Sequence, residues 1–463
     1  MSVPSPRSSL LLLLAAGLSL WAFTFLGDRP IFLDEANVAR NLHDRSFIGL
    51  LRPLDYEQYA PPLYLFVGKV LGELFGYREW ALRLPALLGG LVGVFAVIYG
   101  GRQLRLGYWL LLPLGLLFAN PTVLRYVTEV KPYGSDLGVA ALLIACHVRA
   151  PGRNYAAWAI AGMIAPWVSL PSIFVLAVVG LLRIFRDQRF VGVTVLWLAS
   201  FLLLYHFVLS PAVGSRYLND FHRTYFMPLP TDGASVRQAF DLGVGLLRLS
   251  FGYTAVALLW GTGMLLSGVF LKDVRRSSWL LLPLLLCVVA SHLRFYTLIE
   301  RLMLFALPGI WLFASLAARS VWQRSKKPVR WVHVVCALLT IASTNIYRAV
   351  QEPYRFSDSR RLAEMAASNP YVADGSAVPV LDYYLRVRTG GQSGAVVARP
   401  DPKTLYYRGG RRILFDGTTD ADVREARANY ERRAAERGCR TTWEPLFRSG
   451  SLYVICPEPN YDR

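Results

Sequence analysis

Two adjacent carboxylates, Asp34 and Glu35, are the strongest candidates for chemistry in this chain of 463 residues. They lie in the stretch Phe32-Leu-Asp-Glu-Ala-Asn-Val-Ala-Arg-Asn-Leu-His43, a few residues after a long apolar run. Paired acids near an apolar boundary can have their pKa values driven apart, which leaves one group suited to act as a base. The same acids would also suit the first turn of a helix, where carboxylates accept free backbone N–H groups. Both interpretations remain open at this point.

A second group of polar residues lies in the stretch Tyr126-Val-Thr-Glu-Val-Lys-Pro-Tyr133, and Asp136 follows it closely. Glu129 and Lys131, bounded by proline, fit a tight turn that leads into an apolar segment. The alternative is an interfacial anchor with tyrosine at a membrane boundary. A carboxylate in so short a turn beside apolar segments favours a functional site.

Three arginines, Arg83, Arg294 and Arg301, lie at the ends of other apolar runs. The planar guanidinium is the side chain best suited to hold a phosphate through two hydrogen bonds. Taken singly, each of these arginines could equally extend its charged end from a membrane into water. Their significance depends on which side of the membrane they share.

The composition predicts a polytopic membrane protein. Hydrophobic residues make up 54% of the chain and charged residues only 17%, whereas soluble domains are about 25% charged. Mean hydropathy is +0.36. Residues 1–26 resemble a signal peptide, but no small-x-small cleavage site precedes Gly27, which favours a retained first span. We expect about eleven transmembrane helices, near 10–26, 85–101, 108–120, 135–149, 154–168, 170–185, 190–209, 251–271, 278–293, 302–318 and 331–349.

The positive charge follows the predicted topology. The formal net charge is +19. Arg7 and the loops after the second, fourth, sixth, eighth and tenth runs hold 16 Lys and Arg, against only Asp187 and Asp273. Cytoplasmic loops carry such an excess. We therefore expect a cytoplasmic N-terminus and an extracytoplasmic C-terminal tail, and the charge gives no reason to expect a nucleic-acid partner.

The apolar run Pro61–Phe75 is predicted to be an amphipathic helix at the outer interface. If it crossed the membrane, every later basic loop would face outward, and Lys69 and Glu73 interrupt it. The outer side then holds a first loop at 27–84 with interfacial helices, a turn at 120–134, and a loop at 210–250. All three groups of candidate residues lie on this side, which predicts an active site there.

The tail from 351 is polar enough to be a domain of its own, so we divide the chain into 1–350 and 351–463. Short apolar stretches predict strands at Ala377–Leu381, Arg412–Phe415 and Leu452–Cys456, and 421–437 predicts a charged helix. Gly-rich turns are expected near 390–394 and 409–410. The tail is therefore predicted to be a small α/β or α+β extracytoplasmic domain.

The cysteines exclude a C-x-x-C motif and leave one candidate pair. Cys439 and Cys456 lie in the tail, where an oxidising compartment would allow a disulfide. It would close an 18-residue loop and contribute about 3 kcal/mol. Two unpaired thiols are the alternative. Three further cysteines lie in apolar runs and are expected to be inert: Cys146, Cys287 and Cys336.

The ordered set of motifs resembles the GT-C superfamily of polyprenyl-phosphate-sugar-dependent glycosyltransferases. The resemblance is to the bacterial protein O-mannosyltransferase and aminoarabinose transferase group. It spans roughly 30–310, and the motifs that carry it are Asp34-Glu35, Tyr59-Ala-Pro-Pro-Leu-Tyr64, Arg83-Leu-Pro-Ala-Leu-Leu-Gly89, Glu129-Val-Lys-Pro-Tyr133, and Glu300-Arg301 leading to Pro308.

The resemblance implies a transfer of a sugar from a polyprenyl phosphate to an acceptor hydroxyl, with inversion, on the outer face of the cytoplasmic (inner) membrane of a bacterium. Asp34 would be the base, with Glu35 and Glu129 beside it. The lipid phosphate would be held by Lys131, Arg301, Arg83 and Arg294, where Lys131 stands in place of the arginine of many relatives. Substrate contacts would come from Tyr59, Tyr64, Tyr133 and Asp136.

Several points stay open at this stage. The acceptor could be a protein, a lipid or a glycan. No cofactor is expected to be required, although a divalent metal could assist, since Asp34, Glu35, Glu129 and Asp136 carry oxygen ligands and His292 a nitrogen. One alternative function is a lipid flippase or solute transporter, which the scarcity of charge inside the spans disfavours. The other is a non-catalytic assembly protein of the cell envelope.

Overall fold

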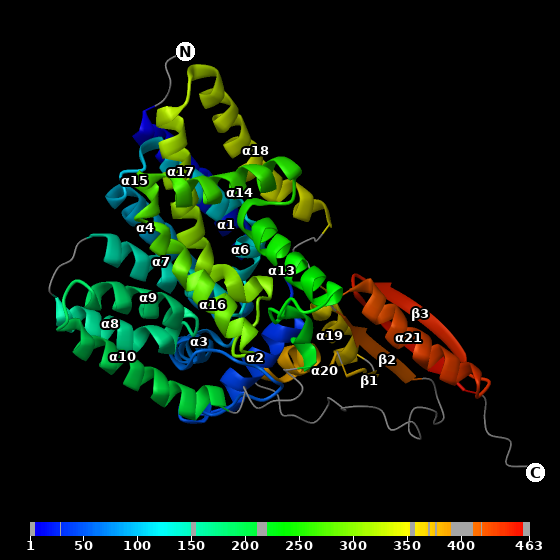
Figure 1. Cartoon of the computed structure of the whole chain (residues 1–463). Helices are drawn as coiled ribbons and strands as arrows, with labels where there is room; N and C mark the ends of the chain where they lie inside the picture. Colours follow the sequence, from blue (N-terminus) through cyan, green and yellow to red (C-terminus); the bar gives the residue numbers. More distant parts are fainter. Residues whose placement is uncertain are drawn as a thin grey trace, which may run out of the picture.

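The computed structural model describes residues 5–27, 29–149, 154–210, 220–351, 357–368, 371–375, 377–389, 411–417 and 419–456. A large helical bundle is joined to a small sheet near the C-terminus (Figure 1). This arrangement confirms the predicted class, a mostly helical polytopic membrane fold with a small C-terminal region of mixed β-sheet. The predicted Gly-rich turns at 390–394 and 409–410 lie outside the described residues.

Helices occupy each of the eleven apolar runs. The first half of the bundle contains α1 Pro6–Leu26, α2 Leu33–Asp44, η1 Gly49–Leu51, α3 Pro62–Phe75, α4 Glu79–Gln103, η2 Gly107–Leu110, α5 Leu111–Ala119, α6 Pro121–Tyr126, α7 Tyr133–Arg149, α8 Tyr155–Val168, α9 Ser172–Ile184, α10 Phe190–Leu204 and η3 Tyr205–Leu209. The second half contains η4 Arg223–Tyr225, α13 Gly233–Phe251, α14 Ala255–Phe270, α15 Lys272–Arg275, η5 Ser278–Leu281, α16 Leu282–His292, η6 Glu300–Ala306, α17 Leu307–Arg324 and α18 Lys327–Gln351.

Four helices of the described chain are long and apolar enough to cross a membrane on their own: Arg7–Leu26, Glu79–Gln103, Phe190–Leu209 and Glu300–Arg324. The pair α13 and α14 forms a fifth candidate, bent by 95° at its break. Shorter apolar helices fill four of the other predicted spans, at Gly107–Ala119, Tyr155–Val168, Ser172–Ile184 and Ser278–His292, and α7 and α18 occupy the remaining two. Such a bundle suits a membrane, where backbone groups must be satisfied within each helix.

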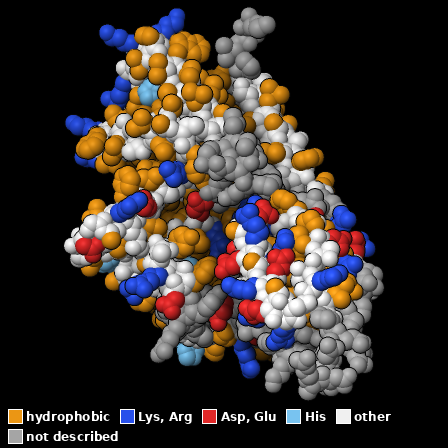
Figure 2. All heavy atoms as spheres, turned by 90° about the vertical axis from the view of Figure 1, so that its right-hand side faces the viewer, with side chains coloured by type: hydrophobic (Ala, Val, Ile, Leu, Met, Phe, Trp, Pro, Cys, Tyr) orange, Lys and Arg blue, Asp and Glu red, His pale blue; other side chains and the backbone are white. Residues whose placement is uncertain are grey.

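The outside of the bundle is apolar. Large hydrophobic side chains are exposed on many helices, among them Phe95, Ile160, Leu198, Leu259, Phe270, Leu285 and Leu338. Figure 2 shows hydrophobic side chains over the upper part of the molecule, Lys and Arg at its upper edge, and mixed charges at the lower right. An exposed apolar band between charged ends is what a lipid bilayer requires of the protein it surrounds.

The first loop forms two helices that lie outside the bundle. Helix α2 begins after Phe32, and helix α3 begins at Pro62, where the fixed φ of proline suits a first helical position. The predicted helix at Pro61–Phe75 is therefore present as α3. It has 14 residues and buries Tyr64 and Leu65, while Val67 and Leu74 are exposed.

Close contact between α4 and α7 positions the polar residues of the outer turns. A Cβ atom on Gly138 would lie 2.1 Å from the carbonyl oxygen of Gly89, and a Cβ on Gly89 would lie 2.5 Å from the Cα of Ser135. Glycine at these positions lets the two backbones touch. Arg83 near the start of α4 is thereby brought close to the turn that precedes α7.

The C-terminal region contains a four-stranded sheet with the order β1-β2-β4-β3. Strands β1 and β2 are parallel, whereas β4 is antiparallel to both β2 and β3. Figure 1 shows α21 alongside these strands. The elements are α19 Ser359–Ser368, β1 Tyr371–Ala373, α20 Val378–Asp382, η7 Tyr383–Val387, β2 Arg411–Asp416, α21 Asp420–Ala435, β3 Arg440–Leu446 and β4 Ser449–Ile455.

Two of the three predicted strands are confirmed, at β2 and β4, as is the charged helix at α21. The strand predicted at Ala377–Leu381 is wrong, because this stretch forms helix α20. Pro379 lies in the first turn of α20, where its missing N–H costs nothing, while in a strand it would remove a ladder hydrogen bond.

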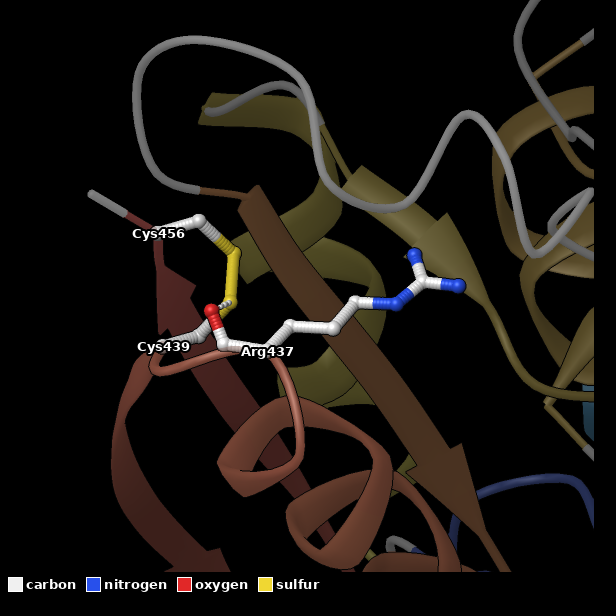
Figure 3. The surroundings of a disulfide bond; sticks show 3 residues. All are labelled: Arg437, Cys439 and Cys456. Carbon is white, nitrogen blue, oxygen red and sulfur yellow. Dashed lines mark hydrogen bonds between the residues drawn. A yellow bond between two sulfur atoms is a disulfide. The ribbon is translucent and has the colours of Figure 1, made fainter. Parts of the chain in front are cut away.

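A disulfide joins Cys439 to Cys456, so the open question of this pair is resolved in favour of the bridge. Figure 3 shows it at the end of strands β3 and β4. The two cysteines flank the register pair Arg440 and Ile455, so they continue the antiparallel pairing by one position. The bridge fastens the end of this hairpin.

The C-terminal region and the first loop share one hydrophobic core. This core includes Leu42 and Tyr64 of the first loop together with Leu362, Tyr383 and Leu381 of the C-terminal region. The division of the chain at 350 and 351 remains a prediction. The shared core means that the C-terminal residues support the loop that carries Asp34 and Glu35.

Candidate active site

Glu35 is completely buried and joins three parts of the fold. Its carboxylate accepts hydrogen bonds from the backbone N–H of Phe32 at 3.1 Å and of Val130 at 2.9 Å. Arg83 donates to both carboxylate oxygens, at 2.8 Å each. Glu35 thus caps α2 and ties it to α4 and to the turn before α7, as the helix-terminus interpretation of the two acids predicts.

Burial alone would raise the pKa of Glu35, but the charge and hydrogen bonds of Arg83 outweigh burial and lower this pKa to about 2. Glu35 is therefore ionised at neutral pH and engaged on both oxygens. A carboxylate held in this way positions its neighbours and is poorly placed to accept a proton from a substrate.

The expectation that Arg83 holds a lipid phosphate does not fit this geometry. Arg83 is 3% exposed. Besides Glu35, its guanidinium donates to the carbonyl oxygen of Arg29 at 2.9 Å and to that of Pro30 at 3.3 Å. Arg83 therefore fixes the segment that leads into α2. The sequence could not reveal this pairing, because Glu35 and Arg83 lie on different elements with no local spacing in common.

Asp34 points to a different set of partners, although it is adjacent to Glu35. Its carboxylate lies 3.9 Å from Nζ of Lys131 and 4.0 Å from a terminal nitrogen of Arg301. The side chain of Asp34 is 34% exposed, against 1% for Glu35. We call Asp34, Lys131 and Arg301 the Asp34 cluster. It joins three outer segments that lie far apart in the sequence, each of which was predicted to carry site residues.

The charges of this cluster determine its protonation. Lys131 above all, and then Arg301, hold the pKa of Asp34 below its ordinary value, although burial acts in the opposite direction. Burial lowers the pKa of Lys131, and Arg301 lowers it further, while Asp34 partly counteracts both. Asp34 is consequently a carboxylate at neutral pH, accessible to solvent and able to accept a proton.

Two residues of the surroundings were not among the predicted site residues. Gln58 accepts a hydrogen bond from Nζ of Lys131 at 2.5 Å. Arg125 donates to Glu129 at 3.1 Å, and its charge also lowers the pKa of Asp34. The four-residue spacing of Arg125 and Glu129 was a sequence signal that these two side chains could pair. Gln58 carried no such signal, apart from its place beside the Tyr59 motif.

Glu129 is 1% exposed and bound to Arg125. The turn that contains Glu129 is held from the other side, because Arg29 donates to the carbonyl oxygen of Thr128. Glu129 therefore stabilises the turn that presents Lys131 to Asp34.

The predicted substrate-contacting residues divide into buried and accessible ones. Tyr64 is buried, and its hydroxyl has no hydrogen-bond partner among the described residues. Burial first, and then the charge of Glu35, raise the pKa of Tyr64. Tyr133 packs edge to face on Tyr126 at 4.9 Å between ring centroids. Asp136 is 3% exposed and lies beside Ser169.

Tyr59 and Arg294 are the two remaining predicted site residues. Tyr59 is partly exposed and follows Gln58 in the chain. Arg294 is exposed in the turn after α16, with φ of +62°. Within the part of the chain that the structure describes, no hydrogen bond or ion pair joins Arg294 to the Asp34 cluster. Among those same residues, no group of three or more His, Cys, Asp and Glu is arranged to hold a metal ion.

No protein-family model and no curated protein matches the chain. Solved structures do match it. The crystal structure of ArnT from Cupriavidus metallidurans bound to undecaprenyl phosphate superposes with a TM-score of 0.53 at 15% identity, over 96% of this chain and 98% of that one. The apo structure of the same ArnT gives a TM-score of 0.54 at 16% identity, with the same coverage.

This chain has the fold of ArnT. The match covers both the helical bundle and the C-terminal sheet, so the predicted resemblance to the aminoarabinose transferase group is confirmed at the level of the fold. ArnT, like this chain, is a multi-pass membrane protein. At this identity the likeness to ArnT concerns the fold, and the roles of Asp34, Lys131 and Arg301 rest on their geometry.

Proposed function

We propose that the chain is a membrane glycosyltransferase that takes its sugar from a polyprenyl phosphate. The observation that carries the proposal is the Asp34 cluster, in which one accessible carboxylate faces two cations. The fold supports it, because ArnT shares this fold and its crystal structure holds undecaprenyl phosphate.

The reaction is one displacement at the anomeric carbon. An acceptor hydroxyl attacks this carbon, the bond from the carbon to the phosphate oxygen breaks, and Asp34 accepts the hydroxyl proton. Polyprenyl phosphate leaves with the bonding electrons, and Lys131 and Arg301 stabilise the charge that develops on it. A single displacement inverts the anomeric configuration and requires no second nucleophile.

The proposal divides the predicted site residues by role. Asp34, Lys131 and Arg301 contact the reacting groups. Glu35 and Arg83 position α2, and Glu129 positions the turn before α7. The phosphate contact predicted for Arg294 and the substrate contacts predicted for Tyr59, Tyr64, Tyr133 and Asp136 stay predictions.

The outer face of the membrane is the proposed side of the reaction. The N-terminus and the connection between α17 and α18 lie at the top of Figure 1, whereas α2 and the C-terminal sheet lie in its lower half. The basic residues Arg324, Lys326 and Lys327 belong to that upper connection. The positive-inside rule then places Asp34 and the C-terminal tail outside the cytoplasm.

The test uses the full chain in lipid nanodiscs, acceptor-containing membranes and a panel of polyprenyl-phosphate hexoses and pentoses, with release of polyprenyl phosphate as the measurement. Loss of a general base lowers the rate by about 10²-fold to 10⁴-fold, so we expect this fall for Asp34→Asn. Asp55→Asn is the matched control, because Asp55 is an exposed acid of the same loop that pairs with Arg45.

The outcomes separate this proposal from its alternatives. Equal release by Asp34→Asn and the unaltered chain would exclude Asp34 as the base. No release from any donor, together with transbilayer movement of a lipid, would favour a flippase. The proposal requires no divalent metal, because it assigns the charge of the leaving phosphate to the two cations, Lys131 and Arg301. Treatment with a chelator is therefore expected to leave the release of polyprenyl phosphate unchanged.

A further inference from the structure

A groove with a cavity of about 550 Å³ runs along one face of α13. Its other wall comes from Tyr225, Leu298, Glu300 and Met303. This wall is held in place by backbone contacts, because the N–H of Leu298 donates to the carbonyl oxygen of Tyr225 at 2.9 Å. The groove is therefore preformed between a helix and a braced segment.

The lining of α13 changes from polar to apolar along the helix. Arg237, Gln238 and Asp241 line the groove near the start of α13, and Leu242, Leu246 and Leu249 continue the same face. From Asp241 to Leu249 the helix rises by about 12 Å. A polar end followed by a leucine-lined channel of this length matches the shape of an amphiphile.

The apolar end of the groove reaches the interior of the bundle. Leu249 and Met303 both belong to the main hydrophobic core. The carbonyl oxygen of Leu249 accepts a hydrogen bond from Asn120 at 2.6 Å, which fixes this end of α13 in the bundle. The opposite end of α13 lies toward the C-terminal region in Figure 1. The groove thus leads from the outer side into the membrane part of the fold.

One lining residue of the groove is next in the chain to a member of the Asp34 cluster. Glu300 lines it, and the next residue, Arg301, lies 4.0 Å from Asp34. Consecutive residues are about 3.8 Å apart along the chain. A headgroup bound at the polar end beside Glu300 is therefore within one residue of the cation that faces the base.

The charges of the groove differ from those of the Asp34 cluster. Among the described residues, its polar part is lined by two carboxylates, Asp241 and Glu300, and one guanidinium, Arg237. The excess of carboxylate disfavours a phosphate, whereas carboxylates and an amide accept hydrogen bonds from hydroxyl groups. The Asp34 cluster has the opposite balance, with two cations for one carboxylate.

We propose that this groove binds the acceptor, and that the acceptor is an amphiphile with a hydroxyl-bearing headgroup free of phosphate at the end that enters the groove. Its headgroup lies between Asp241 and Glu300, and its chain lies along Leu242, Leu246 and Leu249. The assignment as acceptor rests on the proposed glycosyltransferase function, since the donor phosphate is assigned to Lys131 and Arg301.

Two glycines of α13 provide a matched pair of variants. Gly245 lines the groove, and Gly243 belongs to the same helix without lining it. A Cβ atom at either position would meet no atom within 4 Å. Both substitutions replace a helix-weakening residue, so Gly245→Trp fills the groove and Gly243→Trp controls for the added bulk.

The experiment measures photolabelling of the full chain in phosphatidylcholine nanodiscs. The probe is an alkyl glucoside with a diazirine in its chain, and the comparison probe is an alkyl phosphate with the same chain. We expect the glucoside to label α13 and η6, with labelling reduced about tenfold in Gly245→Trp, a loss of about 1.4 kcal/mol, and unchanged in Gly243→Trp and Asp34→Asn.

Equal labelling of the two tryptophan variants, or stronger labelling by the alkyl phosphate, would overturn the inference. The second result would assign the groove to the donor. Polyprenyl phosphate release by the unaltered chain is measured on the same nanodiscs. If release is absent with every donor while the glucoside labels α13, the proposed function fails and the amphiphile groove stands; if release occurs while the glucoside does not label α13, the groove fails alone.

Discussion

The hydroxyl of Tyr384 accepts a hydrogen bond from the backbone N–H of Ile31 at 2.9 Å, although the two residues are 353 positions apart in the chain. Ser359, from the same C-terminal region, donates to the carbonyl oxygen of Ile31 at 2.7 Å. Ile31 precedes Phe32, the residue that caps α2. The C-terminal region therefore holds both backbone polar groups of a residue just before the helix that carries Asp34.

Tyr384→Phe is predicted to lower kcat by roughly 10-fold to 100-fold, because a small displacement of a reacting group has an effect of this size. The variant keeps the ring but removes the acceptor for Ile31 and the donor to Glu79. The donor KM should not change, since Lys131 and Arg301 are supported by other residues. Steady-state kinetics of polyprenyl phosphate release at varied donor concentration measures both constants.

Tyr430→Phe is the control for Tyr384→Phe. The hydroxyl of Tyr430 also bonds a carboxylate, that of Asp374 at 3.2 Å, but within the C-terminal region. A general loss of stability would lower kcat in both variants. If Tyr430→Phe behaves like Tyr384→Phe, the positioning role of Tyr384 is wrong.

Removing one partner of the Glu35 and Arg83 pair should destabilise the fold strongly. The two side chains are 1% and 3% exposed, and breaking a buried pair on one side costs about 3–5 kcal/mol. Glu35→Gln and Arg83→Met are each expected to reduce the yield of folded protein and its thermal stability in nanodiscs.

The double variant Glu35→Gln with Arg83→Met completes this test. If the pair acts mainly through its buried charges, the double variant should be more stable than the sum of the single losses predicts. Additive losses would contradict a direct coupling of Glu35 with Arg83. Glu73→Gln is a suitable control, because Glu73 also pairs with a cation, Lys69, but its own side chain is 49% exposed.

The alkaline limit of the reaction is predicted to depend on Lys131. Burial lowers the pKa of Lys131, so its charge is lost at a lower pH than that of an ordinary lysine, and the rate should fall there. In Lys131→Arg this limb of the pH–rate profile should disappear, since arginine stays charged. Lys131→Met should lose about 10²-fold to 10³-fold in kcat.

The acid limit provides the second measurement on the same variants. Lys131 is the main cause of the lowered pKa of Asp34. Without this cation the pKa of Asp34 rises, the base becomes protonated at higher pH, and the acid limb of Lys131→Met should move to higher pH. An acid limb at the same pH in Lys131→Met and the unaltered chain would show that Asp34 does not set it.

The sequence sufficed to select the three members of the Asp34 cluster. Asp34, Lys131 and Arg301 each lie in a short polar connection between apolar runs, and the basic loops assign these connections to one side. A membrane confines charged residues to one of its two sides, because charged residues within the apolar layer are costly. Residues far apart in the sequence can therefore be assigned to the same side of the membrane from the sequence alone.

The pairings within the site could not be predicted from sequence. Glu35 on α2 bonds both Arg83 on α4 and the N–H of Val130 before α7, and α4 and α7 approach through Gly89 and Gly138, a contact that leaves no periodic signal. The strand predicted at Ala377–Leu381 was wrong for a related reason. A short apolar stretch is compatible with a helix or a strand, and here packing against α2 in the shared core accompanies the helix.

Asp416 is expected to make the stability of the C-terminal sheet depend on pH. It lies at the end of β2 opposite Ser449, is 2% exposed, and burial raises its pKa to about 8. In an unfolded chain an aspartate has a pKa of about 3.9. Between these two values the folded chain holds a proton that the unfolded chain has released, so the free energy of unfolding falls as pH rises from about 4 to about 8.

This loss should approach about 1.4 kcal/mol per pH unit within that range. Asp416→Asn removes the titration while keeping the shape of the side chain, so the pH dependence should flatten. Hydrogen exchange of the β2 and β4 amides in the full chain, corrected for the intrinsic effect of pH, reports the local free energy of opening. Glu444→Gln, a change of a carboxylate that is 51% exposed on β3, should keep the slope of the unaltered chain. The same slope in Asp416→Asn would show that another group holds the proton.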